Sequence, residues 1–193
     1  MKKLILLLLF NSFTYAQLDW SDPNECKLSD HTEFTKAILE KMTLEQKVGQ
    51  VIMPEINSVS PEQAKKFHLG TILNGGGGFP NQKKNSTIED WKNLSKNYYD
   101  ASTIVDGQKL PILWGTDAVH GHNNVVGATI FPHNIGLGAT RDPQIVEAVA
   151  RATALEVAAT GIDWDFAPCL AVPDDFRWGR TYEGLSENTE LVT

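Results

Sequence analysis

Cysteine is scarce in this sequence of 193 residues, which contains only Cys26 and Cys169. A scaffold built on disulfides needs several bridges, so two distant cysteines exclude that class of small extracellular protein. An exported chain could still join them, but nothing local in the sequence brings the two together. We therefore expect one or both cysteines to be buried as free thiols.

An excess of positive charge is also absent. Lysine and arginine together number 17 against 24 aspartates and glutamates, which gives a formal net charge of −7. Proteins that bind nucleic acid or anionic membrane surfaces need basic patches, so the composition argues against both kinds of partner. An acidic protein also repels polyanions, which favours a neutral substrate.

Long apolar runs are missing except at the N-terminus. There, residues 4–10 are all apolar, they follow Lys2 and Lys3, and small residues lead up to Ala16. This order is typical of a secretory signal peptide, and the run is too short to span a bilayer. We predict that residues 1–16 are removed, that the mature chain begins at Gln17, and that it is periplasmic or secreted, with no membrane span. The alternative is a buried N-terminal helix.

The rest of the chain shows alternating helical and strand patterns. Apolar spacing predicts a helix through Phe34, Ile38 and Met42, and a capping box of Thr43 and Gln46 predicts another. Further helices are predicted at residues 61–67, 87–103 and 142–160, the last ending at Gly161, with an apolar face of Ile145, Val149, Ala152, Leu155 and Ala159. Strands are predicted at residues 48–53, 70–73, 111–116, 162–167 and 170–172.

These strands are apolar throughout, which is typical of a parallel sheet covered by helices. Either a doubly wound sheet or a (β/α)8 barrel fits the pattern. Only about four β/α units are present, whereas such a barrel typically takes about 250 residues. Residues 186–193 resemble the first turn of another helix, so we expect the sequence to be truncated at its C-terminus.

Asp117 directly follows the strand predicted at residues 111–116. In β/α folds, side chains at the carboxyl ends of strands point into the functional site. A carboxylate there can accept hydrogen bonds from two neighbouring sugar hydroxyls. The alternative for Asp117 is a helix cap or a structural ion pair.

A second polar segment, residues 177–183, reads Arg-Trp-Gly-Arg-Thr-Tyr-Glu. Arginine holds hydroxyls or carboxylates with a rigid fork of donors, and aromatic faces stack on sugar rings. The alternative is an ion-pair network between Arg177 and Glu183 that only ties a loop down. The glycines at residues 75–78 lack the Gly-Lys-Ser/Thr ending of a phosphate-binding loop. They predict a tight turn close to a ligand or another loop.

His120, His122 and His133 raise the possibility of a metal site. Zinc needs three or four convergent ligands, and Cys169 is the only other soft ligand here. We therefore expect these histidines to hold loop backbone, and we expect no metal and no cofactor. A barrel metallohydrolase using His120 and His122 remains the rival hypothesis.

Several long motifs occur together in one order, and the chain resembles family 3 glycoside hydrolases of the β-glucosidase and exo-β-glucanase branch. The likeness spans about residues 38–193 and is carried by residues 41–50, 110–140, 154–161, 166–168 and 177–183. It implies an incomplete TIM-like (β/α)8 barrel in which residues 17–36 are a lead and residues 37–193 part of the first domain. It also implies a further α/β sandwich domain of the same polypeptide.

The resemblance implies a retaining, exo-acting β-glucosidase acting on terminal glucosyl residues of β-glucosides or β-glucan oligosaccharides. Such enzymes use a nucleophilic aspartate and an acid/base glutamate, and the family places both beyond Thr193. A lysine–histidine pair that grips the sugar also falls beyond that residue. Asp117 and Arg180 match the family's sugar-binding residues, so they are the predicted substrate-binding positions.

The sequence departs from the family pattern at two places and leaves alternatives open. Phe176 stands where proline is usual, and Asn188 where an acid is common, so the loop after the fourth strand could be set differently. The same family includes β-xylosidases and N-acetylglucosaminidases, although a carboxylate at Asp117 suits a hexose with free O4 and O6. A non-catalytic sugar-binding module is the third hypothesis.

Overall fold

The computed structural model describes residues 32–193 of the chain. The chain divides into two units between Ala37 and Ile38, and the helix α1 (Thr32–Lys41) crosses that boundary. The remaining helices are α2 (Leu44–Gln50), α3 (Pro61–Lys66), α4 (Ile88–Asp100), α5 (Asn134–Ala139), α6 (Pro143–Ala159) and α7 (Thr189–Val192). The strands are β1 (Thr71–Asn74), β2 (Thr103–Val105), β3 (Gln108–Leu110), β4 (Leu113–Thr116) and β5 (Trp164–Asp165), and short 3-10 turns cover Pro80–Gln82 and Thr181–Glu183.

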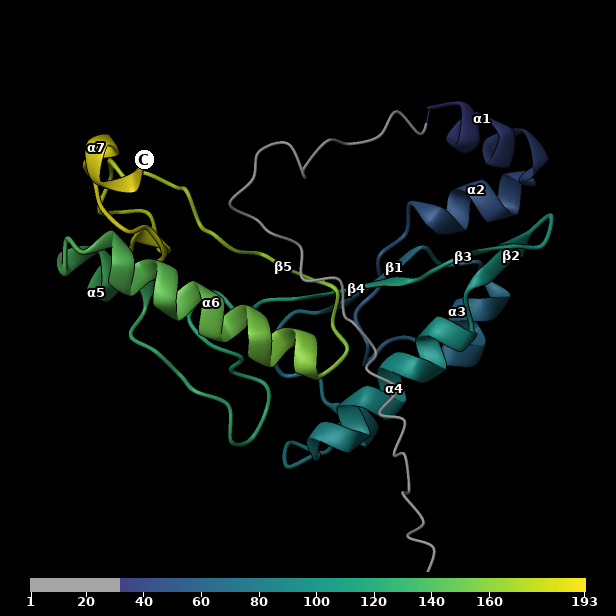
Figure 1. Cartoon of the computed structure of the whole chain (residues 1–193), viewed down its shortest axis with the longest axis horizontal. Helices are drawn as coiled ribbons and strands as arrows, with labels where there is room; N and C mark the ends of the chain where they lie inside the picture. The colour runs from purple at the N-terminus through teal and green to yellow at the C-terminus, as the bar shows by residue number, and fades with distance from the viewer. Residues whose placement is uncertain (1–31) are drawn as a thin grey trace, which may run out of the picture. The chain divides into compact units, whose positions relative to one another are not determined.

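The centre of the unit Ile38–Thr193 is a three-stranded parallel sheet in the order β1-β4-β5 (Figure 1). Asn74 lies beside Thr116, and Thr116 lies beside Asp165, so one row of residues crosses the carboxyl ends of all three strands. Helix α4 lies in the connection from β1 to β4, and α6 lies in the connection from β4 to β5. Spatial order follows chain order, as in successive units of a β/α barrel. A doubly wound sheet would instead reverse direction at a switch point.

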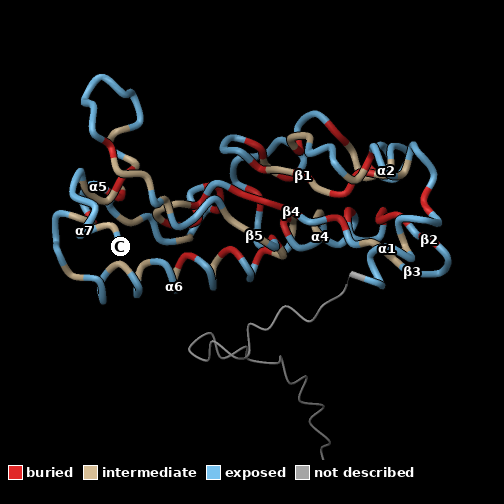
Figure 2. The backbone as a smooth tube through the Cα atoms, turned by 90° about the horizontal axis from the view of Figure 1, so that it is seen from above, coloured by how far each residue is buried: buried red, intermediate tan, exposed pale blue. Residues whose placement is uncertain are grey.

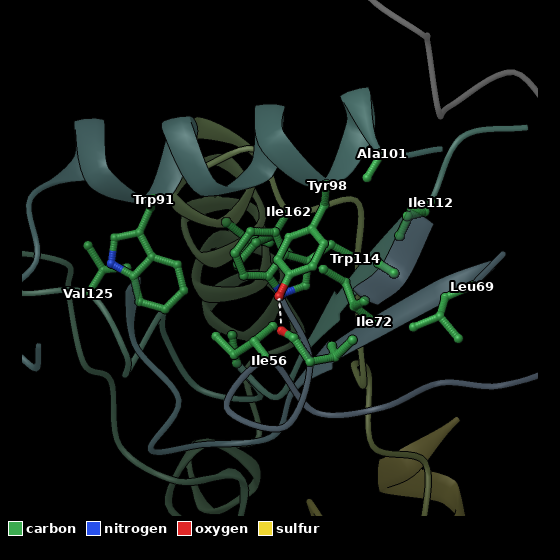
Figure 3. Packing of buried hydrophobic residues seen from close by; sticks show 14 residues of the cluster. Ile56, Leu69, Ile72, Trp91, Tyr98, Ala101, Ile112, Trp114, Val125 and Ile162 are labelled. Carbon is green, nitrogen blue, oxygen red and sulfur yellow. Dashed lines mark hydrogen bonds between the residues drawn. The ribbon is translucent and has the colours of Figure 1, made fainter. Parts of the chain in front are cut away.

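The main core lies between α4 and the sheet (Figure 3). Trp91 and Tyr98 of α4 pack against Trp114 of β4, with ring centroids 5.9 Å and 5.8 Å from that of Trp114. Tyr98 is buried, and its hydroxyl donates to the carbonyl oxygen of Val59 at 2.7 Å, the dashed line in Figure 3. Burial raises the pKa of Tyr98 to about 12. This aromatic packing holds β4 in place from one side.

The segment around α2 corrects the strand predicted at residues 48–53. Helix α2 begins with the expected capping box, in which Thr43 Oγ1 accepts from the Gln46 amide at 3.2 Å and Gln46 Oε1 accepts from the Thr43 amide at 2.9 Å. The helix then continues to Gln50. Gly49 is buried against the carbonyls of Phe67 and His68, where a β-carbon would lie only 2.2 Å from the Phe67 oxygen. This contact, which a larger side chain could not make, keeps the start of the apolar run in the helix rather than in a strand.

Residues 101–110 correct the helix predicted to reach residue 103. Helix α4 begins after the N-cap Thr87 but ends at Asp100, and β2 and β3 then form an antiparallel hairpin. Asp106 and Gly107 make its two-residue turn with φ angles of 50° and 77°. An Asp-Gly pair with both φ angles positive is typical of a type I′ hairpin turn, so the sequence did contain the signal.

Helix α6 starts and stops where predicted, but the face that it buries differs. Asp142 Oδ1 accepts from the amides of Gln144 and Ile145, and Gly161 ends the helix with a φ of 81°. The buried residues are Thr153 and Val157, whereas Ile145, Leu155 and Ala159 of the predicted face are exposed. Apolar residues surround this helix on several sides, so spacing alone does not select the face that packs inward.

The fourth strand is much shorter than predicted. Only Trp164 and Asp165 pair with β4, and residues 170–172 form no strand. Pro168 has no backbone N–H to donate, which is incompatible with continuing the ladder. The helical turn predicted near residues 186–193 is present as α7, capped by Asn188. Within residues 32–193, no helix is both long and apolar enough to cross a membrane.

Candidate functional site

The carboxyl edge of the parallel sheet carries Asp117 and the glycine segment 75–78, two of the features singled out in the sequence. Because β1, β4 and β5 run parallel, their last residues share this edge. Residues 75–78 leave β1 there, Asp117 follows β4, and Phe166 follows β5. The sequence-based expectation that Asp117 follows a strand is confirmed.

Asp117 is an exposed residue between two fully buried ones. Thr116 and Ala118 both have 0% exposure, whereas the Asp117 side chain faces solvent. In Figure 2 the strand β4 is mostly red. The backbone on both sides of Asp117 is therefore set by the core, and the carboxylate is free to contact a ligand.

Asp165 is a half-buried carboxyl at the same edge that sequence reasoning missed. Its Oδ1 accepts the Ala118 amide at 2.7 Å, and no Lys or Arg of residues 32–193 forms an ion pair with it. Burial raises the pKa of Asp165, the amides of Ala118 and Phe166 oppose that rise, and the negative charge of Asp117 adds to it. The available signal was weak, because Asp165 lies within the strand predicted at residues 162–167 and becomes its last residue only in the structure.

Both arginines of the segment 177–183 form ion pairs within their own loop. Arg177 binds Asp175 through Nε at 3.0 Å and a terminal nitrogen at 2.6 Å. Arg180 binds Glu183 in the same two-pronged way, at 2.7 Å and 2.6 Å. The pairing holds the pKa of Glu183 below its usual value and raises that of Arg180. Loop-tying ion pairs are thus present, with Asp175 rather than Glu183 as the partner of Arg177.

Helix α5 anchors this loop. Asn134 Nδ2 donates to the Glu183 carbonyl at 2.8 Å, and the His133 ring packs edge-on against Tyr182 with centroids 4.7 Å apart. Gly138 lies so close to Leu185 that a β-carbon would be 1.7 Å from its carbonyl oxygen. Only glycine fits at this approach, so α5 and the loop are held in tight contact.

His120 and His133 each hold loop backbone through Nδ1, one as a donor and the other as an acceptor. His120 Nδ1 donates to the Phe131 carbonyl at 2.8 Å, and His133 Nδ1 accepts the Asn134 amide at 2.9 Å. Both confirm the prediction that these histidines hold loop backbone. Burial lowers the pKa of His133, and the neighbouring His120 lowers it further. No group of three metal-ligating side chains lies together in the part of the chain that the structure describes.

His122 is fully buried beside Trp91, with ring centroids 6.0 Å apart. Its Nε2 lies 3.0 Å from Thr160 Oγ1, and that hydroxyl already donates to the Val157 carbonyl. Nε2 must therefore carry the proton and act as donor. Burial lowers the pKa of His122 to about 4, so the ring is neutral at physiological pH.

The glycine segment 75–78 forms the predicted tight turn. Gly76 and Gly77 have φ angles of 91° and 92°, and the Gly77 amide donates to Asn124 Oδ1 at 3.3 Å. The turn from β1 is thereby tied to the loop that follows β4, at the same edge of the sheet as Asp117.

The two predicted sugar-binding residues are not linked to each other. No hydrogen bond or ion pair joins Asp117 to Arg180 in residues 32–193.

Cys169 is half-buried and is a free thiol among the described residues. Cys26 and the predicted signal peptide lie outside those residues.

Comparison with known proteins places this site in context. The family model of the glycosyl hydrolase family 3 N-terminal domain matches residues 43–193. The lysosomal beta glucosidase of Dictyostelium discoideum is 29% identical over 93% of this chain, and the periplasmic beta-glucosidase of Salmonella typhimurium is 29% identical over 83%. The chain spans 24% and 19% of the lengths of these two relatives.

A solved structure supports the same fold. The exo-1,3/1,4-beta-glucanase from a Pseudoalteromonas species is 49% identical, with a TM-score of 0.77 over 84% of this chain and 21% of that one. The prediction of part of a TIM-like β/α barrel is confirmed, and the doubly wound alternative is wrong.

Proposed function

The chain belongs to glycosyl hydrolase family 3, and from that premise we propose that the full-length protein is an exo-acting, retaining β-glucosidase. It removes terminal, non-reducing β-D-glucosyl residues from oligo- or polysaccharides. Two β-glucosidases and an exo-β-glucanase among the similar proteins support this substrate class. In this proposal residues 17–36 are a lead segment and residues 37–193 are part of the first domain.

The observation that carries the proposal is the exposed Asp117 carboxylate at the carboxyl edge of the barrel strands. A carboxylate fixed there can accept hydrogen bonds from two adjacent hydroxyls of the terminal sugar. Charge-assisted bonds of this kind contribute about 1.5–3 kcal/mol each. Arg180 supplies donors from the loop after β5, and the aromatic rings around it supply an apolar face for the sugar.

The reaction itself needs two carboxyl groups, which we assign to residues other than Asp117 and Arg180. Retention of configuration requires a nucleophilic carboxylate and an acid/base carboxyl about 5 Å apart. We place both on further residues of the polypeptide, the second within an α/β sandwich domain. The chain spans only 24% and 19% of the lengths of the two β-glucosidase relatives, which supports that placement. Residues 17–193 alone should therefore not hydrolyse an aryl β-glucoside.

Export is the second part of the proposal. The basic, apolar and small-residue order of residues 1–16 is that of a signal peptide, and a similar protein in Salmonella typhimurium is periplasmic. Mass spectrometry of the periplasmic or secreted protein should find an N-terminus at Gln17. Cytosolic protein that retains Met1 would contradict this assignment.

The functional assignment is tested by replacing Asp117 in the full-length protein. Asp117→Ala should lower kcat/KM for an aryl β-glucoside by about 100-fold, because the lost contacts strengthen in the oxocarbenium-like transition state. The melting temperature should stay near that of the parent, since an exposed side chain supports little of the core. Asp117→Asn keeps the shape and loses the charge, so its kcat/KM should lie between the two.

Three results would contradict the proposal in different ways. A parent protein that binds glucosides but never turns them over would be a sugar-binding module. A parent that prefers xylosides or N-acetylglucosaminides would be another member of the family. Parental kcat/KM in Asp117→Ala would show that Asp117 has only a structural role.

A further inference from the structure

We propose that Asp165 is a positioning residue that fixes the direction of the Asp117 carboxylate toward the sugar. The inference rests on the proposed function, because it assigns Asp165 a role in that same site. It concerns a residue that the motifs of the sequence did not single out.

The first step is the hydrogen bonding on both sides of Asp117. On one side, the Thr116 carbonyl accepts the Phe166 amide at 3.2 Å. On the other, the Ala118 amide donates to Asp165 Oδ1 at 2.7 Å. Two bonds to β5 and the residue after it therefore bracket Asp117, and the second is made by the Asp165 side chain.

The second step is burial. Thr116 and Ala118 are fully buried, so an Ala118 amide without its partner would be left unpaired inside the protein. Asp165 is half-buried beside Asp117, and both burial and the Asp117 charge raise the pKa of Asp165. A charged carboxylate in such a place raises the free energy of the folded state unless hydrogen bonds compensate. The Ala118 amide donates one such hydrogen bond.

The third step links the bond to the reaction. Rotation of the peptide between Asp117 and Ala118 changes the direction in which the Asp117 side chain leaves the backbone. The Asp165 carboxylate prevents that rotation by holding the Ala118 amide. A misplacement of about 1 Å at a reacting site can cost about 100-fold in rate. Because contacts to the sugar strengthen in the transition state, the loss should fall more on kcat than on KM.

The chain offers a matched control at the other end of β4. Asp163 Oδ2 accepts the Trp114 amide at 2.8 Å, so it makes the same kind of side chain–backbone bond two residues earlier on the neighbouring segment. Trp114 lies away from the carboxyl edge. Removing the Asp163 bond therefore tests the structural cost alone.

The experiment measures kcat and KM for an aryl β-glucoside in the full-length protein carrying Asp165→Ala, Asp165→Asn or Asp163→Ala. Asp165→Ala should lower kcat/KM at least tenfold, mainly through kcat. Asp165→Asn keeps an oxygen acceptor for the Ala118 amide and should remain within about threefold of the parent. Asp163→Ala should also stay within about threefold, whatever it does to the melting temperature.

A double variant separates positioning from an independent effect. If Asp165 acts through Asp117, adding Asp165→Ala to Asp117→Ala should change kcat/KM by less than twofold. A further tenfold loss in that background, or parental kcat/KM in Asp165→Ala alone, would overturn the inference. If Asp165→Ala does not fold, Asp165→Leu provides the same test with the volume filled. A parent without β-glucosidase activity would overturn the proposed function itself.

Discussion

The two candidate sugar-binding residues, Asp117 and Arg180, are held in place in contrasting ways. Asp117 follows a buried strand, and buried residues lie on both sides of it. Arg180 lies in an exposed loop and is paired with Glu183 of the same loop. The core therefore sets the position of Asp117, whereas local polar contacts set that of Arg180.

This difference predicts which measurement should detect a substitution in each region. A substitution beneath β4 should affect Asp117 by destabilising the whole domain. A change around the loop reaches Arg180 through its orientation alone and should leave the fold intact. Paired substitutions, one in each region, can test the distinction.

The largest difference is expected between two tryptophans. Trp114→Ala removes a ring with 2% exposure that contacts both Trp91 and Tyr98, and it should lower the free energy of unfolding by about 3–5 kcal/mol. Trp178→Ala removes a ring with 39% exposure beside Arg180 and should change that free energy by less than about 0.5 kcal/mol. Urea unfolding of both variants measures the contrast. Equal losses would show that the loop belongs to the core.

The next effect concerns pH and two histidines. His122 has a pKa of about 4 in the folded state against 6.5 when unfolded. As pH falls from about 6.5 towards 4, the unfolded chain binds a proton that the folded protein does not bind. The free energy of unfolding therefore decreases over that window. Between pH 7 and pH 5 this amounts to about 2 kcal/mol. His122→Phe keeps an aromatic ring and should remove that part of the pH dependence.

His133→Phe is the matched variant in the loop region. The pKa of His133 is also lowered, but the ring is only half-buried, so this variant should reduce the pH dependence of unfolding less than His122→Phe does. The free energy of unfolding in urea at pH 7 and pH 5 gives both values. A parental slope in His122→Phe would mean that its ring is not buried in solution.

A smaller effect is expected where α5 holds the loop. Asn134→Ala removes the bond to the Glu183 carbonyl and should cost about 1 kcal/mol of stability, since a typical net hydrogen bond contributes that much. Hydrogen exchange of residues 175–185 should become faster, and kcat/KM of the full-length protein should fall. Asn123→Ala, at an exposed position nearby in the sequence, is the control and should change neither. Unchanged exchange in Asn134→Ala would refute the anchoring role.

The smallest effect is expected at Glu183. Glu183→Gln breaks the ion pair with Arg180 while keeping the shape of the side chain. The Arg180 side of this pair is exposed, and such pairs contribute little, so kcat/KM should fall no more than about fivefold and the melting temperature should not move. Asp175→Asn makes the same change at Arg177 and should leave kcat/KM unchanged. A melting temperature that drops in Glu183→Gln would place this pair among the supports of the fold.

The elements that could be predicted are those with local causes. The caps at Thr43 and Asp142 form within three residues of each helix start, so sequence alone identifies them. The strand predicted at residues 48–53 was wrong because an apolar run of that length fits a helix or a strand equally well. What decides it is Gly49, whose contact with the carbonyls of Phe67 and His68 is a tertiary one.

The site divides in the same way. Asp117 could be predicted because it follows an apolar strand directly in the sequence. The part played by Asp165 could not, because its bond to the Ala118 amide spans 47 residues and depends on the register of β4 with β5. The buried face of α6 is likewise set by what it packs against, and Thr153 lies on that face although its polarity suggests otherwise.

The parallel pairing of the strands has a consequence for synthesis on the ribosome. Thr116 of β4 bonds to the Asn74 carbonyl of β1 across 42 residues, so β1 remains without β4 beside it until those residues have been added. At about 5–20 residues per second this takes about two to eight seconds. During that interval the newly made Ile72 lacks its register partner Trp114, and the segment has time to meet a chaperone before it can fold.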